Sequence, residues 1–110
     1  MQWFDMQQVN GDCHQAGAQW REFLRVPALS AGLYVLAAGA VDGQSPHTED
    51  ELYYIIAGRG QIRVAGEDRP VQPGVAVFVA AHVEHHFHAI EEALQVLVIF
   101  APAEYSKSGS

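Results

Sequence analysis

Residues 45–60 read SPHTEDELYYIIAGRG, and the other strand-like segments of the chain can be arranged around this stretch. A histidine and three carboxylates precede a run of aromatic and β-branched residues, which favour strands, and glycines end the run. A second stretch, residues 74–88, reads GVAVFVAAHVEHHFH and joins an alternating apolar segment to a histidine cluster. Together they predict two strands that carry side chains able to bind a metal.

Alternation along an extended chain places the candidate ligands of the first stretch on one face. Every second side chain of a strand points to the same side. His47, Glu49 and Glu51 therefore share a face, together with Ser45 and Tyr53. Neutral imidazole and ionised carboxylate are common ligands of divalent transition metals. Alternation by itself leaves both Glu49 and Glu51 open as the carboxylate ligand.

The histidine cluster divides in the same way. His85 and Phe87 share one face, and His86 and His88 share the other. We expect the face with Phe87 to point inward, because an aromatic ring gains more from burial. His85 is then the histidine available to an internal site, and the other two face outward.

The spacing of the two stretches resembles the two motifs of the cupin family. The first family motif, G-x5-H-x-H-x3,4-E-x6-G, is matched in spacing by Gly39, Ser45, His47, Glu51 and Gly58. The second, G-x5-P-x-G-x2-H-x3-N, is matched in spacing by Gly74, Ala80, His82, His85 and Ala89. The 15 residues between the two motifs are similar to the short connection of small single-domain microbial cupins.

This resemblance implies an all-β fold, a double-stranded β-helix or jelly-roll barrel of antiparallel strands with little or no helix. It also implies a divalent transition metal, Fe, Mn, Ni or Zn, held by His47, Glu51 and His85. Ser45 stands where the family has its first histidine. Three protein ligands are therefore expected rather than four, with water in the remaining place; Ser45 stays a candidate for an extra ligand or for a residue that supports one.

Three further residues are candidates for supporting roles. His82 replaces the turn glycine of the family, and histidine is among the residues that tolerate positive φ. We favour a turn role for it, with support of a ligand and direct metal binding as alternatives. Glu49 and Tyr53 are the candidate catalytic groups, because both share the face of the expected ligands.

Length, charge and cysteine content limit the class of protein. A chain of 110 residues fits one domain. The net charge of −7 disfavours nucleic-acid binding, since no basic stripe is present. The single cysteine, Cys13, fits a reducing compartment, and neither a signal peptide nor a membrane span is evident. We expect a cytoplasmic protein.

The remaining segments are assigned from turn residues and alternation. Residues 1–19 are expected to be an irregular N-terminal segment with a turn at Asn10-Gly11, followed by a barrel core over 20–102 and a frayed tail over 103–110. Expected strands are 20–26, 31–37, 61–64, 69–71 at an edge, 75–79 buried on both sides, and 94–100. Turns or loops are expected at 58–60, 65–68 and 90–93.

Two functions follow from these features. The first is a metal-dependent enzyme acting on a small molecule, of oxygenase or isomerase type, since three protein ligands leave positions open for substrate. The alternative is a binding or sensing module without turnover. The resemblance also implies a homodimer, and Trp3, Phe4 and Trp20 are large apolar groups that either cover the core or form its contact.

Overall fold

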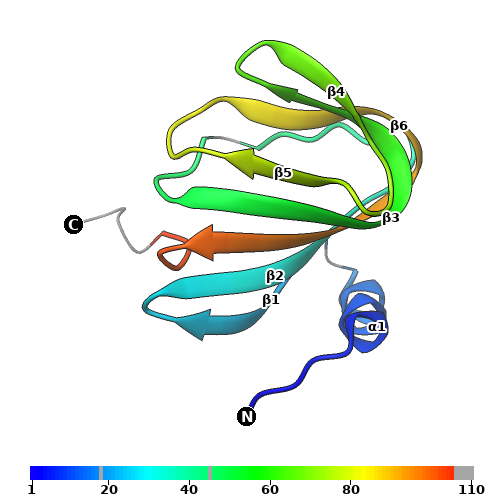
Figure 1. Ribbon diagram of the computed structural model, residues 1–110. Coiled ribbons are helices and arrows are strands. Elements are labelled where there is room, and N and C mark those ends of the chain that lie inside the picture. Colours follow the sequence, from blue (N-terminus) through cyan, green and yellow to red (C-terminus); the bar gives the residue numbers. More distant parts are fainter. Residues whose placement is uncertain (18, 45, 106–110) are drawn as a thin grey trace.

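The computed structural model in Figure 1 describes residues 1–17, 19–44 and 46–105. Its elements, in chain order, are α1 (Met6–Ala16), β1 (Trp20–Val26), β2 (Leu29–Leu36), β3 (Asp50–Val64), β4 (Glu67–Val71), β5 (Ala76–Val79) and β6 (His85–Ala101). The strands pair antiparallel in the order β1-β2-β6-β3-β4, and β5 pairs with the N-terminal half of β3. The expected antiparallel β fold is therefore present, with one short helix added.

Two long strands make this one sheet into a barrel. β3 and β6 pair along their whole length, from Asp50 opposite Ala101 to Val64 opposite His85, with register shifts in the middle. Bulges of this kind bend a strand and increase its twist. Figure 1 shows both strands curving on the right, away from the layer of β1, β2 and β5 and into the layer of β4. Both strands begin on the left of the view, at the open end of the barrel.

Gly58 lies at the bend of β3. Its φ is +91°, and a Cβ there would come within 2.1 Å of the carbonyl oxygen of Ala93 on β6. Only glycine can make this approach, because it has no side chain and adopts positive φ without penalty. The turn expected at residues 58–60 is thus a bend within one continuous strand.

The interior of the barrel is filled by the inward side chains of β2, β3, β4, β5 and β6. They alternate with outward residues, as in strands packed on one face. The core comprises Leu36, Tyr53, Ile55, Ile62, Val71, Val79, Phe87, Ile90, Leu94, Val96, Val98 and Phe100. His85 and Phe87 both point into this core, as alternation predicted.

The N-terminal segment is helical where irregular structure was expected. Asp5 caps α1 by accepting a hydrogen bond from the backbone N–H of Gln7 at 2.8 Å, and Gly17 ends the helix with φ +64°. Val9 and Cys13, one turn apart, are buried on the side facing β1 and β2. Among residues 1–17, 19–44 and 46–105, no helix is long and apolar enough to cross a lipid bilayer.

Two other expectations about strands were wrong. Residues 90–93 belong to β6 and form no loop; Glu91 and Glu92 point outward there and pair with Arg59 at 2.9 and 3.4 Å. β5 is not buried on both faces, since Phe78 is 61% exposed. The strand positions of 20–26 and 94–100 and the edge position of β4 are confirmed.

The chain after β6 does not begin to fray at residue 103. Ala103 and Glu104 are 2% and 8% exposed, and they lie beside the open end of the barrel. The rest of the expected tail, residues 106–110, lies outside the described residues, as does Ser45.

Candidate metal centre

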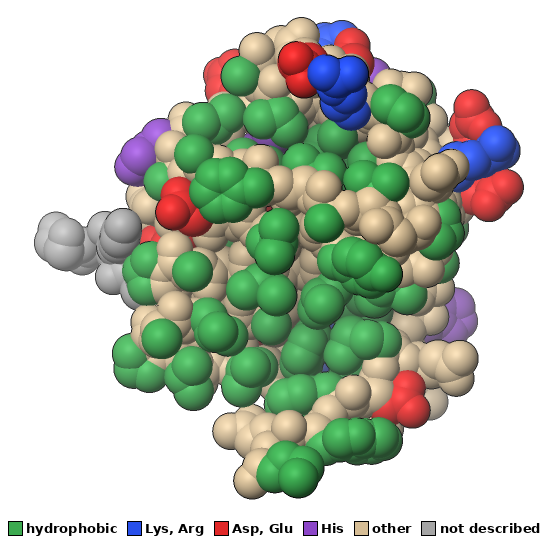
Figure 2. Space-filling view, viewed as in Figure 1, with side chains coloured by type: hydrophobic (Ala, Val, Ile, Leu, Met, Phe, Trp, Pro, Cys, Tyr) green, Lys and Arg blue, Asp and Glu red, His purple; other side chains and the backbone are tan. Residues whose placement is uncertain are grey.

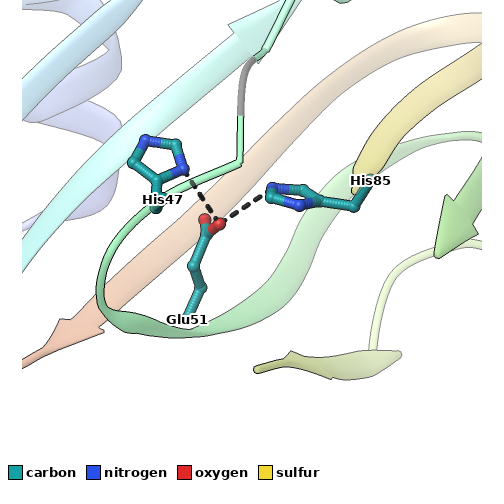
Figure 3. Close-up of side chains that lie close together, drawn as sticks. All are labelled: His47, Glu51 and His85. Carbon is teal, nitrogen blue, oxygen red and sulfur yellow. Dashed lines mark ion pairs between the residues drawn. The ribbon is translucent and has the colours of Figure 1, made fainter. Parts of the chain in front are cut away.

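Three of the expected ligands meet at the open end of the barrel. His47 comes from the segment before β3, Glu51 from the start of β3 and His85 from the start of β6. One nitrogen or oxygen atom of each lies within 4.8 Å of the other two. Figure 3 shows both imidazole rings directed toward the Glu51 carboxylate. Glu51 is therefore the carboxylate that joins the two histidines.

When both imidazoles are neutral, the two ring nitrogens that face Glu51 are hydrogen-bond acceptors. His85 Nδ1 lies 2.8 Å from the Val83 carbonyl, to which it donates its proton. His47 Nε2 lies 3.1 Å from Glu104 Oε2 and donates in the same way. A neutral imidazole carries one N–H only, so the lone pairs of His85 Nε2 and His47 Nδ1 point at the carboxylate.

Acceptors facing one another at this distance repel unless a proton or a metal ion lies between them. Glu51 Oε1 lies 2.8 Å from His85 Nε2 and 3.2 Å from His47 Nδ1. Within the described residues, these three atoms and Glu51 Oε2 are buried without a hydrogen bond. Buried polar atoms are rarely left in that state. Two imidazole nitrogens and one carboxylate are the donor set of a divalent transition metal, so the residues fit such an ion.

Protons and a metal ion would compete for the same nitrogen atoms of this centre. Burial alone would raise the pKa of Glu51, but hydrogen bonds with His47 and His85 lower it to about 2. Hydrogen bonds with Glu104 and Glu51 raise the pKa of His47 to about 9. Burial works against protonation of His85, and Glu51 and Val83 nevertheless raise its pKa. A metal must therefore displace protons from the imidazoles.

A pocket of about 360 Å³ opens beside the three ligands and reaches them through His47. Its walls combine aromatic rings, small residues and one acid. They are formed by Trp20, Tyr34, Gly43, Gln44, Pro46, His47, Val98, Phe100, Glu104 and Tyr105. The His47 ring packs against Phe100 and Tyr105, with ring centroids 4.8 and 5.9 Å away.

A family model described as a cupin domain matches residues 32–100, which include all three ligands. The chain belongs to the cupin family. This cupin is 40% identical over 104 residues to the uncharacterized protein SCO3923 of Streptomyces coelicolor, covering 94% of this chain and 99% of that protein.

Solved structures of other cupin-like proteins share the barrel. KdgF from Halomonas sp. is 27% identical, with a TM-score of 0.69 and 76% of each chain covered. The DMSP lyase DddQ from Ruegeria pomeroyi is 25% identical, with a TM-score of 0.65; the match covers 69% of this cupin and 39% of that chain.

The two candidate catalytic groups of the cupin are both engaged inside the protein. Glu49 is fully buried, and its carboxylate accepts hydrogen bonds from the Tyr105 backbone N–H at 2.7 Å and from the Thr48 hydroxyl. Tyr53 is also fully buried and donates to Gln44 Oε1 at 3.1 Å. Burial and the charge of Glu51 raise the pKa of Tyr53, so the phenol stays protonated.

The remaining histidines of the cluster lie away from the ligands. His82 is exposed, has φ +66° and donates its backbone N–H to the His47 carbonyl at 2.7 Å, as a turn residue does. His88 Nε2 lies 2.9 Å from Asp68 Oδ1 on the outer face of the barrel, and the ring of His86 lies beside it.

Sequence reasoning missed two carboxylates that organise the site. Glu104 holds His47 from the segment after β6, and no periodicity marks that segment. Asp42 is 7% exposed and accepts from the Tyr34 hydroxyl, the Gln44 amide and the Phe87 backbone N–H. The sequence offered one indication of Asp42, its position in the loop between two predicted strands. Loop residues of many kinds occupy such positions, so the indication was weak.

Proposed function

We propose that this cupin binds one divalent transition metal through His47, Glu51 and His85 and acts on a small molecule that enters the adjoining pocket. The observation that carries the proposal is the convergence of two imidazole nitrogens and one carboxylate oxygen, all within 4.8 Å of one another and buried. His47, Glu51 and His85 would hold the ion, which when bound would supply Lewis-acid chemistry to a substrate oxygen or to water. Lewis-acid chemistry fits an isomerase type of reaction, and a redox-active ion such as iron(II) would fit an oxygenase.

The relatives support an enzymatic role without naming the reaction. The DMSP lyase DddQ is an enzyme built on a barrel of this kind. Because one fold hosts many reactions, that activity is not carried over to this cupin. The single free cysteine agrees with the cytoplasmic location that we propose.

Metal content tests the ligand set. Wild-type protein, purified without added metal and then dialysed against zinc, should retain one equivalent by elemental analysis. His47→Ala and His85→Ala should lose it, because each removes one of three ligands. His86→Ala and His88→Ala are matched controls from the same strand and should retain zinc. Full occupancy in both ligand variants would overturn the assignment.

The pocket walls favour a neutral or cationic part of the substrate. Among its described lining residues none is Lys or Arg, Glu104 is acidic, and four are aromatic. Aromatic faces and a nearby carboxylate attract cations. An anionic group would therefore bind only through the metal.

A panel of ligands equal in shape tests this preference. Choline, 3,3-dimethylbutanol and 3,3-dimethylbutyrate present the same bulky head with positive, zero and negative overall charge. We expect affinity to fall in that order, measured by Trp20 fluorescence in a Trp3→Phe background. Tightest binding of the anion to metal-free protein would contradict the proposed preference.

A non-catalytic binding module is the second candidate. It is favoured by the engagement of Glu49 and Tyr53 in internal hydrogen bonds, which leaves neither poised as a base at the pocket. Oxygen consumption by the iron(II)-loaded protein, and conversion of ligands that bind, separate the two. Binding without turnover of any bound compound selects the module.

We also propose a homodimer through the outer face of β3, β5 and β6. Leu52, Tyr54 and Phe78 are 41%, 45% and 61% exposed there, and Leu52 lies opposite Phe78 in the strand pairing. Figure 2 shows apolar side chains gathered over the middle of this face. Two copies that each carry a net charge of −7 repel, so an uncharged face is where they can meet.

A further inference from the structure

We propose that Glu104 is a positioning residue that selects the metal-binding nitrogen of His47. Its Oε2 lies 3.1 Å from His47 Nε2, while the other ring nitrogen, Nδ1, faces Glu51 at 3.2 Å. The carboxylate keeps the proton on Nε2, so the lone pair of Nδ1 is directed to the metal position. The inference rests on the proposed function, in which that position holds the ion.

The position of Glu104 is determined by the fold on both sides of its backbone. Its N–H donates to the Ser30 hydroxyl at 2.8 Å, and Ser30 is fully buried. Its carbonyl accepts from Arg25 Nη2 at 2.6 Å. The next residue, Tyr105, donates its N–H to Glu49. Strands β1 and β2 therefore hold the segment after β6 against the site.

Burial makes the contact with His47 effective. The side chains of Glu104 and His47 are only 10% and 11% exposed, so water competes little for either group. When a ring nitrogen of histidine binds a metal, the N–H of the other ring nitrogen can donate to a carboxylate. That carboxylate orients the ring and makes the histidine a stronger metal ligand. His85 receives the corresponding support from the Val83 carbonyl. Each histidine of the centre thus has a hydrogen-bond acceptor behind it.

Glu104 has a second possible role, at the wall of the pocket. It lines the substrate pocket as well as touching His47. The effect of a substitution at Glu104 is therefore measured on metal binding alone, with no pocket ligand present. Zinc alone is the probe.

Zinc affinity, measured by competition with a chromophoric chelator, tests the role. Glu104→Ala should weaken zinc binding about 10- to 100-fold, the usual effect of losing such a partner. Glu104→Gln keeps an oxygen for the N–H and should recover most of the loss. Glu91→Ala removes an exposed carboxylate on β6 and should change nothing. Wild-type affinity in Glu104→Ala would overturn the proposal.

Long-range ¹H–¹⁵N correlation spectra of labelled protein identify which ring nitrogen of His47 binds zinc. On zinc loading, His47 should be metallated at Nδ1 and protonated at Nε2; metal on Nε2 would overturn the proposal. In metal-free protein, the His47 Nε2–H resonance should be protected from exchange, and Glu104→Ala should abolish that protection. If wild-type protein takes no zinc, the proposed function fails, while this resonance still decides the role of Glu104. Unprotected Nε2–H in the wild type counts against it.

Discussion

Trp20 on β1 lies directly against Gly32 on β2: a Cβ added at Gly32 would come within 2.3 Å of Cη2 of the indole. The ring also makes edge contacts with Tyr34 and Phe100, at centroid distances of 6.4 and 6.2 Å, and forms a wall of the pocket. Because Gly32 has no side chain, the Trp20 ring can lie where it forms a wall of the pocket.

Gly32→Ala should displace Trp20. We expect a loss of about 1–3 kcal/mol in the free energy of unfolding, typical of overpacking, and weaker binding of pocket ligands. Denaturant melts and Trp20 fluorescence in a Trp3→Phe background measure both effects. Gly43→Ala is the control for stability alone, because a Cβ there meets nothing within 4 Å but Gly43 also lines the pocket. Unchanged fluorescence in Gly32→Ala would show that the ring does not depend on this glycine.

Gly11→Ala should stabilise the protein. Gly11 lies inside α1, and a Cβ there meets no atom within 4 Å. Glycine in a helix interior costs roughly 1 kcal/mol relative to alanine, so a gain of about that size is expected in chemical denaturation. Gly17→Ala should do the opposite, since Gly17 ends the helix with φ +64°. A loss of stability in Gly11→Ala would argue against α1.

The proposed dimer should dissociate when its face becomes charged. Phe78→Glu places a carboxylate on an exposed position opposite Leu52, where two copies would bring like charges together. We expect sedimentation velocity to show a dimer for the wild type and a monomer for the variant. Val41→Glu, at an exposed apolar position outside the sheet, is the control. A monomeric wild type would refute the dimer.

The metal-free protein should become less stable as pH rises. Hydrogen bonds with Glu104 and Glu51 raise the pKa of His47 from 6.5 to about 9. A group whose pKa is higher in the folded than in the unfolded protein stabilises the fold. That stabilisation is complete at pH values below the unfolded-state pKa and is lost as the pH rises through the folded-state pKa. The free energy of unfolding should therefore decline between pH 6.5 and 9, by on the order of 3 kcal/mol.

Thermal melts in the presence of a chelator measure this decline, and His47→Gln should flatten it. His14→Gln, at an exposed position in α1, should leave the slope unchanged. A wild-type melting temperature that rises over this range would contradict the predicted protonation of His47. Bound zinc should oppose the decline, because it takes the place of the proton.

Local patterns were enough to predict the main strands and the shared faces of the candidate ligands. The two-residue period of a strand is a property of the backbone, so it placed His85 and Phe87 on one face, and the burial preference of Phe87 predicted that this face is the inner one. The family spacing selected Glu51 over Glu49, and both glutamates are buried as alternation required. Positive φ at His82 followed from its place in a turn.

Tertiary structure decided what depends on distant partners. The 90–93 segment reads as a charged loop, yet pairing of β6 with β3 keeps it extended through a bend that Gly58 permits. α1 contains glycine and polar residues, and it is held by burial of Val9 and Cys13 against the sheet. Such contacts supply free energy that local propensity lacks.

The sequence by itself determined which residues are candidates to bind a metal, because ligand chemistry and strand alternation are local. Only the folded chain decided how they are used. Glu104 stands 57 residues after His47, and its carboxylate reaches the ring because Arg25 on β1 and Ser30 on β2 hold the backbone of Glu104 beside the site. No local pattern encodes that approach, since it arises from the pairing of whole strands.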